Sequence, residues 1–156
     1  MVNISDKISF EDIIRVVIEN EGVSIAPDIN ERVERSFDFL KSFAGKKVIY
    51  GINTGFGPMA QYRVDDDQLK ELQFNIIRSH SCGAGAPLKD VYVRGSLLAR
   101  LSTFLKGMSG VNRELTDLLV VFLNTGIYPV VPEHGGVGAS GDLVQMAHLG
   151  LALIGE

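Results

Sequence analysis

The sequence is poor in cysteine and in basic charge, and both scarcities exclude classes of protein. Cys82 is the single cysteine among 156 residues, so an internal disulfide is impossible, as is typical of proteins from a reducing compartment. Lys and Arg number 15 against 19 Asp and Glu, a formal net charge of −4, which lacks the basic excess that sequence-independent nucleic-acid binding requires. We therefore expect no nucleic-acid partner.

Long hydrophobic runs are also missing. The most apolar stretch, residues 143–154, is broken by Gln145 and His148 and is shorter than the ~20 residues that span a bilayer. The N-terminal segment 1–12 has no basic region followed by an apolar one, the pattern of a secretory signal. We therefore expect a cytoplasmic protein without a membrane partner. Because the last residues are still apolar, we also expect further polypeptide to follow them.

Apolar residues recur at the spacing of one helix face along most of the chain, which predicts an all-α fold. Ser9 and Asp12 form a capping-box pattern before the first helix, and Asn112 and Gly126 bracket the fifth. Residues 48–49 are candidates for a short strand. We expect one mainly helical domain over residues 1–156, with short strands at most and helices at about 10–18, 28–43, 67–81, 91–106, 112–126 and from 141 onward.

Two glycine-rich segments, residues 50–63 and 128–141, break the helical pattern. Long irregular loops inside a compact helical domain are uncommon and often functional. The second segment runs into the sequence GGVGASGD at residues 135–142. Its simplest interpretation is a helix N-terminus capped by Ser140 or Asp142. Capping alone leaves the number of glycines unexplained.

A nucleotide-binding interpretation fits the same glycines poorly. Gly136, Gly138 and Gly141 formally match the dinucleotide fingerprint GxGxxG. That fingerprint needs a strand leading directly into it and an acidic residue at the end of a second strand ~20 residues later. Here Pro132 and the two residues after it precede the glycines, and proline is poor strand material. The sequence therefore argues against a dinucleotide cofactor.

A third interpretation is an electrophile formed by the backbone itself. In the run Ala139, Ser140, Gly141, the glycine nitrogen can attack the alanine carbonyl carbon, and loss of two waters leaves a ring with an exocyclic methylidene. Glycine has no Cβ to obstruct this attack, and serine supplies the β-oxygen that leaves. A helix that begins directly afterwards favours electron-rich transition states beside its N-terminus. Ala-Ser-Gly is a common tripeptide, so the surrounding motifs must decide between the three interpretations.

Three motifs resemble the aromatic amino acid ammonia-lyases, the family of histidine, tyrosine and phenylalanine lyases. Residues 50–60 (YGINTGFGPMA) are similar to the tyrosine loop of that family, and residues 73–83 (QFNIIRSHSCG) to its selectivity helix. Residues 135–143 (GGVGASGDL) are similar to the segment that becomes methylidene-imidazolone. The resemblance runs from about residue 8 to the end and covers the N-terminal portion of the family's longer polypeptide. It implies the helical fold shared by ammonia-lyases and fumarases.

This resemblance implies a specific reaction. Family members deaminate an aromatic L-amino acid to the trans-α,β-unsaturated acid and ammonia, with no external cofactor. The electrophile, 4-methylidene-imidazol-5-one, would form from Ala139, Ser140 and Gly141, and Asp142 matches the position that assists cyclisation. Family members are homotetramers whose later segments complete the active site. A chain of 156 residues is therefore expected to be inactive alone.

The resemblance also implies roles for the other motif residues. Tyr50 matches the catalytic base that takes the β-proton, and Gly57 matches a position beside the substrate backbone, where a side chain would obstruct. Ser79 and His80 match the pair that contacts the substrate ring, and Leu143 is expected to line the pocket. Because histidine can hydrogen-bond either an imidazole or a phenol, the choice among histidine, tyrosine and phenylalanine as substrate stays open.

Two other functions stay open as well. An aminomutase shares the electrophile but adds ammonia back, and a non-catalytic helical module would use the fold for packing alone.

No metal site is expected, since Cys82, His134 and His148 do not have metal-ligand spacing. His148, within the apolar last helix, is more simply a hydrogen-bonded core histidine. Arg78 and Arg100 are expected to be solvated or ion-paired.

Overall fold

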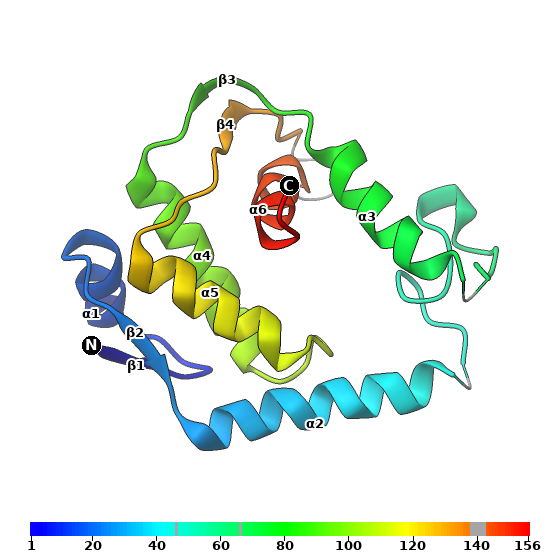
Figure 1. Ribbon diagram of the computed structural model, residues 1–156, viewed down its shortest axis with the longest axis horizontal. Helices are drawn as coiled ribbons and strands as arrows, with labels where there is room; N and C mark the ends of the chain where they lie inside the picture. Colours follow the sequence, from blue (N-terminus) through cyan, green and yellow to red (C-terminus); the bar gives the residue numbers. More distant parts are fainter. Residues whose placement is uncertain (46, 66, 138–142) are drawn as a thin grey trace.

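Helices make up most of the regular structure of this chain (Figure 1). The computed structural model describes residues 1–45, 47–65, 67–137 and 143–156, and the predicted all-α class with short strands at most is confirmed. None of the helices in these ranges is long and apolar enough to cross a membrane. The α-helices are α1 (Phe10–Ile13), α2 (Pro27–Ala44), α3 (Leu69–His80), α4 (Asp90–Leu105), α5 (Arg113–Thr125) and α6 (Leu143–Leu153).

Local capping signals place several helix ends where the sequence predicts them. The Asn112 side chain accepts a hydrogen bond from the Leu115 N–H at 3.1 Å and begins α5. Gly126 ends the same helix in the left-handed conformation, with φ of 69°. Ser9 and Asp12 form the predicted capping box before α1. These signals are readable from sequence because donor and acceptor lie within one helical turn of each other.

The first helix departs from the prediction after one turn. Beyond α1 the chain continues as a wider π-helical turn, Ile14–Ile18, and Asn20 ends it in the left-handed conformation with φ of 59°. A tertiary contact accompanies the wider turn, since the Val16 carbonyl oxygen accepts a hydrogen bond from Arg94 Nε, 78 residues away. The local pattern of apolar residues carries no sign of this contact.

The strands form two separate pairs, β1 (Val2–Ile4) parallel to β2 (Val23–Ile25) and β3 (Ala84–Pro87) antiparallel to β4 (Pro132–His134). β4 falls where the sequence argued against a strand because of its proline. Proline is tolerated there because it is the first residue of a strand that is paired on one side only. Neither two-stranded sheet resembles the doubly wound sheet that holds dinucleotides.

The strand predicted at Val48 and Ile49 is wrong. The Ile49 N–H donates to the Asn53 side-chain oxygen at 2.7 Å, and the Ile49 carbonyl oxygen accepts from the N–H groups of Ile52 and Asn53. Because both backbone groups of Ile49 close a turn, they are not available to a neighbouring strand.

The hydrophobic core lies among α2, α4, α5 and the first sheet. α4 contributes the largest share, and α3 by contrast buries none of its residues completely. α3 and α6 pack on each other beside this core, and the loop after α2 lies beyond α3 (Figure 1). α3, which carries one of the family motifs, is therefore more lightly packed than α4. Fully buried core side chains include those of Ile4, Val16, Val23, Val33, Leu97, Leu98, Leu101, Leu105, Leu119 and Leu123.

Arg94 is a charged side chain within this core, only 2% exposed. Its Nε donates to the Val16 carbonyl oxygen, and its Nη1 donates to the Leu123 carbonyl oxygen at 2.6 Å and to the Tyr128 hydroxyl at 2.8 Å. Its Nη2 donates to the Glu21 carbonyl oxygen at 2.8 Å. The guanidinium thus joins the π-helical turn, the end of α5 and the segment that leads to β4.

We expect Arg94→Met to lower the free energy of unfolding by about 3 kcal/mol or more, because each buried acceptor left unpaired costs about 1–3 kcal/mol. Urea unfolding followed by circular dichroism measures this loss. Arg100→Met on the same helix is the matched control. Its half-buried guanidinium lies 5.7 Å from the Phe104 ring, and its removal should cost less than about 1 kcal/mol. Equal losses in the two variants would contradict the role given to Arg94.

Candidate active site

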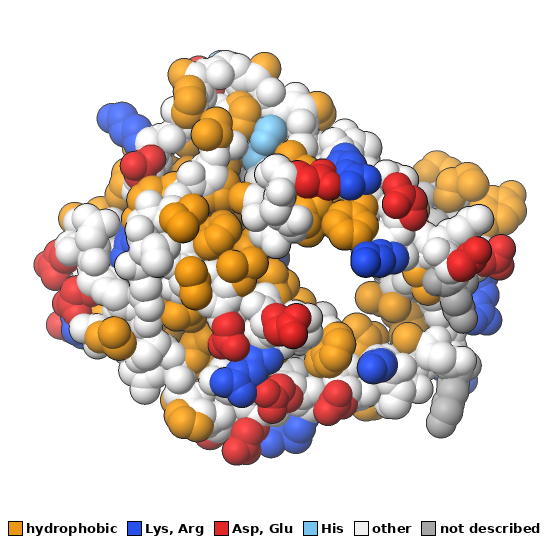
Figure 2. Space-filling model, viewed as in Figure 1, with side chains coloured by type: hydrophobic (Ala, Val, Ile, Leu, Met, Phe, Trp, Pro, Cys, Tyr) orange, Lys and Arg blue, Asp and Glu red, His pale blue; other side chains and the backbone are white. Residues whose placement is uncertain are grey.

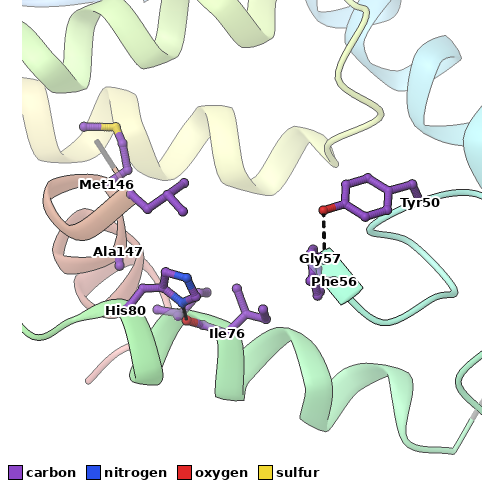
Figure 3. A pocket seen from close by; sticks show the side chains of 9 residues that line it. Tyr50, Phe56, Gly57, Ile76, His80, Met146 and Ala147 are labelled. Atoms are coloured by element: carbon purple, nitrogen blue, oxygen red, sulfur yellow. Dashed lines mark hydrogen bonds between the residues drawn. The ribbon is translucent and has the colours of Figure 1, made fainter. Parts of the chain in front are cut away.

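A cavity of about 550 Å³ lies between α3, α6 and the loop that follows α2 (Figure 3). This volume is within the range of about 300–1,000 Å³ that is usual for small-molecule sites. Figure 2 shows hydrophobic side chains gathered around an opening in the molecule. The cavity is lined mainly by apolar groups, with one phenol and one imidazole among them: Tyr50, Phe56, Gly57, Ile76, Ile77, His80, Leu143, Met146 and Ala147.

Four of the residues predicted for the site line this one cavity, although they lie far apart in the sequence. They are Tyr50, Gly57, His80 and Leu143. Ser79 is not in the lining, because its side chain is exposed and its hydroxyl donates to the Ile76 carbonyl oxygen at 3.1 Å. The predicted residues Ala139, Ser140, Gly141 and Asp142 lie outside the described residues.

Tyr50 enters the cavity from the loop after α2, and a neighbouring backbone group holds its hydroxyl. The Gly57 N–H donates to the Tyr50 oxygen at 3.3 Å, and the Phe56 ring meets the phenol edge-on with centroids 5.9 Å apart (Figure 3). Gly57 has φ of +53°, and a Cβ there would meet no described atom within 4 Å. Within the described protein, backbone conformation rather than crowding therefore favours glycine at this position.

The loop that carries Tyr50 is anchored by the buried side chain of Asn53. Asn53 is 3% exposed, its oxygen accepts from the Ile49 N–H, and its nitrogen donates to the carbonyl oxygens of Ala44 at 3.0 Å and Lys47 at 2.8 Å. The Ala44 carbonyl belongs to the last residue of α2. One amide therefore ties the turn at Tyr50 to the end of a long helix.

His80 is the last residue of α3, and its ring is oriented by its own helix. The Nδ1 atom lies 2.9 Å from the Ile76 carbonyl oxygen and 3.1 Å from the Ser79 hydroxyl. Because a carbonyl oxygen can only accept, this geometry assigns the proton to Nδ1. In the neutral ring Nε2 is then a hydrogen-bond acceptor, carried by a side chain that lines the cavity.

Several lining residues were not predicted from the sequence. Ile76 and Ile77 precede His80 by four and three positions, and Met146 and Ala147 follow Leu143 by three and four. Residues at these spacings share one face of a helix. The same spacing could have found them, once His80 and Leu143 were placed on helices.

Other candidate residues lie outside the cavity lining. Cys82 is exposed with a free thiol, and the Arg100 guanidinium lies over the Phe104 ring. Arg78 binds the Glu156 carboxylate through two nitrogens, at 2.9 and 2.5 Å, and these hydrogen bonds lower the pKa of that carboxylate. Within the described ranges, no group of three His, Cys, Asp or Glu side chains is placed to hold a metal ion.

Comparison with known proteins extends the evidence from the motifs. Residues 8–156 match the family described as aromatic amino acid lyase. The chain belongs to this family. A histidine ammonia-lyase from Geobacillus thermodenitrificans is 45% identical over 143 residues, which is 91% of this chain and 28% of that protein. The family predicted from the three motifs is thereby confirmed.

Solved structures of related enzymes have the same fold. A tyrosine aminomutase from Streptomyces globisporus matches with a TM-score of 0.91 at 34% identity, covering 99% of this chain and 30% of that one. An ergothionase from Treponema denticola matches with a TM-score of 0.90 at 34% identity, covering 97% and 31%. The chain thus spans less than a third of the length of these relatives. The names of the relatives denote different enzymes: an ammonia-lyase, an aminomutase and an ergothionase.

We expect Asn53→Asp to loosen the tyrosine loop, because a carboxylate keeps an acceptor for the Ile49 N–H but has no donor for the Ala44 and Lys47 carbonyl oxygens. The local loss should be about 1–3 kcal/mol, the usual cost of unpairing buried polar groups. Limited proteolysis and hydrogen exchange of residues 44–57 measure it. Asn75→Asp, the same change at an exposed position of α3, is the control. Unchanged exchange in Asn53→Asp would argue against the anchor.

Proposed function

We propose that the full-length protein containing this chain is an ammonia-lyase that converts an aromatic L-amino acid to the trans-α,β-unsaturated acid and ammonia. The observation that carries this proposal is the meeting of Tyr50, His80 and Leu143, from three separate segments, around one cavity. A phenol and an imidazole in an otherwise apolar cavity suit an aromatic substrate. The similarity to histidine ammonia-lyases supports the same reaction class.

The segment Ala139, Ser140, Gly141 would form the methylidene-imidazolone of the family, with Asp142 assisting the cyclisation. When formed, that group supplies an electrophilic carbon that activates the substrate for loss of its amine. The surroundings fit, because Leu143 follows Gly141 by two residues and lines the cavity together with Tyr50. The apolar faces of Leu143, Met146 and Ala147 can hold the carbon skeleton of the substrate beside it.

Tyr50 is the proposed base. Its phenolate oxygen takes the β-proton of the substrate, the electron pair of that C–H bond forms the new double bond, and the C–N bond breaks so that the amine leaves as ammonia. The Gly57 N–H donates to the Tyr50 oxygen at 3.3 Å and so holds that oxygen in place at the cavity.

His80 is proposed to recognise the substrate ring through a hydrogen bond to Nε2. With the proton on Nδ1, Nε2 accepts a hydrogen bond from an imidazole N–H or a phenol O–H, and a phenyl ring offers no such donor. Histidine or tyrosine is therefore favoured over phenylalanine. Ser79 acts on the ring only through His80, since its hydroxyl lies 3.1 Å from His80 Nδ1. The tetramer stays a prediction from the family resemblance, and the cytoplasmic location stays a prediction from the sequence.

An aminomutase is the second candidate. The tyrosine aminomutase from Streptomyces globisporus has nearly the same fold over 99% of this chain, with a TM-score of 0.91. The two reactions differ in whether ammonia leaves or adds back at the β-carbon. Incubation of the full-length protein with histidine, tyrosine or phenylalanine separates them by product, unsaturated acid against β-amino acid. If none of the three amino acids gave a product, the result would instead support a non-catalytic helical module.

We expect Ser140→Ala in the full-length protein to lower kcat/KM by about 10³-fold or more, the scale of losing a covalent catalytic group. The wild-type peptide that contains residues 139–141 should be lighter than its sequence mass by two waters, and the variant peptide should not. Mass spectrometry and the rate of product formation measure both effects. Ser42→Ala, at an exposed hydroxyl of α2, is the control. A wild-type peptide of unmodified mass would refute the proposed electrophile.

We expect His80→Phe to lower kcat/KM for the preferred substrate by about 10- to 100-fold. The ratio of this kcat/KM to that for phenylalanine should fall as well. The reason is that the variant loses the acceptor for the donor on the substrate ring. Steady-state rates with the three aromatic amino acids measure the preference. His134→Phe, an exposed histidine of β4, should leave the preference as it is. An unchanged ratio of kcat/KM between the preferred substrate and phenylalanine in His80→Phe would exclude His80 as the selectivity residue.

A further inference from the structure

His148 lies behind the cavity wall and joins two segments that line or flank it. It is half-buried on α6, and its Nε2 accepts a hydrogen bond from the Gly83 N–H at 3.1 Å, across 65 residues. The predicted hydrogen bond of His148 is thus confirmed, but the residue is half-buried and is not part of the core. His148 is not among the described residues that line the cavity.

The junction around Gly83 is tightly packed. A Cβ at Gly83 would lie 2.9 Å from His148 Nε2 and 3.0 Å from the Pro132 ring, so only glycine fits between the imidazole and β4. At Gly135 a Cβ would lie 2.6 Å from a methyl carbon of Val144 and 3.4 Å from Gly83 Cα. The imidazole therefore contacts the chain where Gly83 packs closely against Pro132 and α6, and little free space remains there.

The location of this junction matters for the site. Gly83 follows His80 by three residues, and α6 begins directly after the segment 139–142. Farther along α6, a Cβ at Gly150 would lie 3.3 Å from Ile77, so the two helices also cross closely there. Because α3 buries none of its residues completely, its distance from α6 is set by the direct packing of the two helices and by the junction at Gly83 rather than by a surrounding core.

We propose that His148 is a positioning residue that holds the His80 wall of the cavity at its distance from the α6 wall. This inference rests on the proposed function for its catalytic consequence. The contact requires a neutral ring with the proton on Nδ1, because Nε2 is the acceptor. Loss of the acceptor frees the Gly83 segment, shifts His80 relative to the helix that follows Ser140, and weakens the fit of the substrate ring.

Two variants of the full-length protein test the proposal, His148→Gln and His148→Asn. Both side chains end in the same amide group, and they differ only in the length of the side chain. The Gln oxygen can lie where Nε2 lies, and the Asn side chain is one methylene too short. We expect residues 81–87 to exchange amide hydrogens about three- to tenfold faster in the Asn variant, the effect of losing one hydrogen bond. We expect KM for the preferred substrate to rise about tenfold or more in that variant, with a smaller change in kcat.

In the Gln variant, the exchange of residues 81–87 and the KM should both stay close to the wild-type values. His134→Asn at an exposed histidine is the control for removal of an imidazole. Equal behaviour of the Gln and Asn variants, folded or unfolded, would overturn the proposal, since a general role in stability would not depend on reach. Faster exchange with an unchanged KM would overturn it as well. Absence of turnover and of the two-water mass loss in the wild type would refute the proposed function instead, and the exchange comparison would still decide whether the His148 contact holds the segment.

Discussion

One buried guanidinium organises the part of the chain on which the site is built. Arg94 is removed from water and has no carboxylate partner within the described ranges of the chain. Its charge is tolerated because carbonyl and hydroxyl oxygens of three segments converge on it. One of these partners, Tyr128, begins the segment that runs through β4 to the glycine-rich loop. The Arg94 side chain therefore joins α4 to the end of α5 and to the start of the segment that leads to β4.

In the site, each polar side chain is oriented by its own segment, whereas the distances between the segments depend on contacts between residues far apart in the sequence. Tyr50 is held by the N–H of Gly57 and His80 by the carbonyl of Ile76, so each polar group takes its orientation from its own segment. Such fixed dipoles need little reorganisation when charge develops, which is the usual source of electrostatic catalysis. The distance between α3 and α6 depends instead on the direct packing of these two helices and on the hydrogen bond from Gly83 to His148, because α3 buries none of its residues completely.

Much of the fold and part of the site follow from local pattern. The caps at Asn112 and Gly126 are readable because they are closed by hydrogen bonds within one turn. The motifs around Tyr50, His80 and Ser140 are likewise short runs, and they sufficed to predict the family. The predicted strand at residues 48–49 was wrong because the Asn53 side chain uses the backbone donor that pairing would need. The π-helical turn was missed because its partner, Arg94, is distant in sequence.

The sequence alone therefore determined the helical class, most helix boundaries, the family and the residue types available for chemistry. Only the tertiary structure decided which of them share a cavity, which nitrogen of His80 faces its own helix, and that His148 contacts Gly83. The physical reason is the range of the interactions. Helix periodicity and capping act over three or four residues, whereas the cavity and the His148 contact join groups that meet only after the chain has folded, 65 residues apart in the latter case.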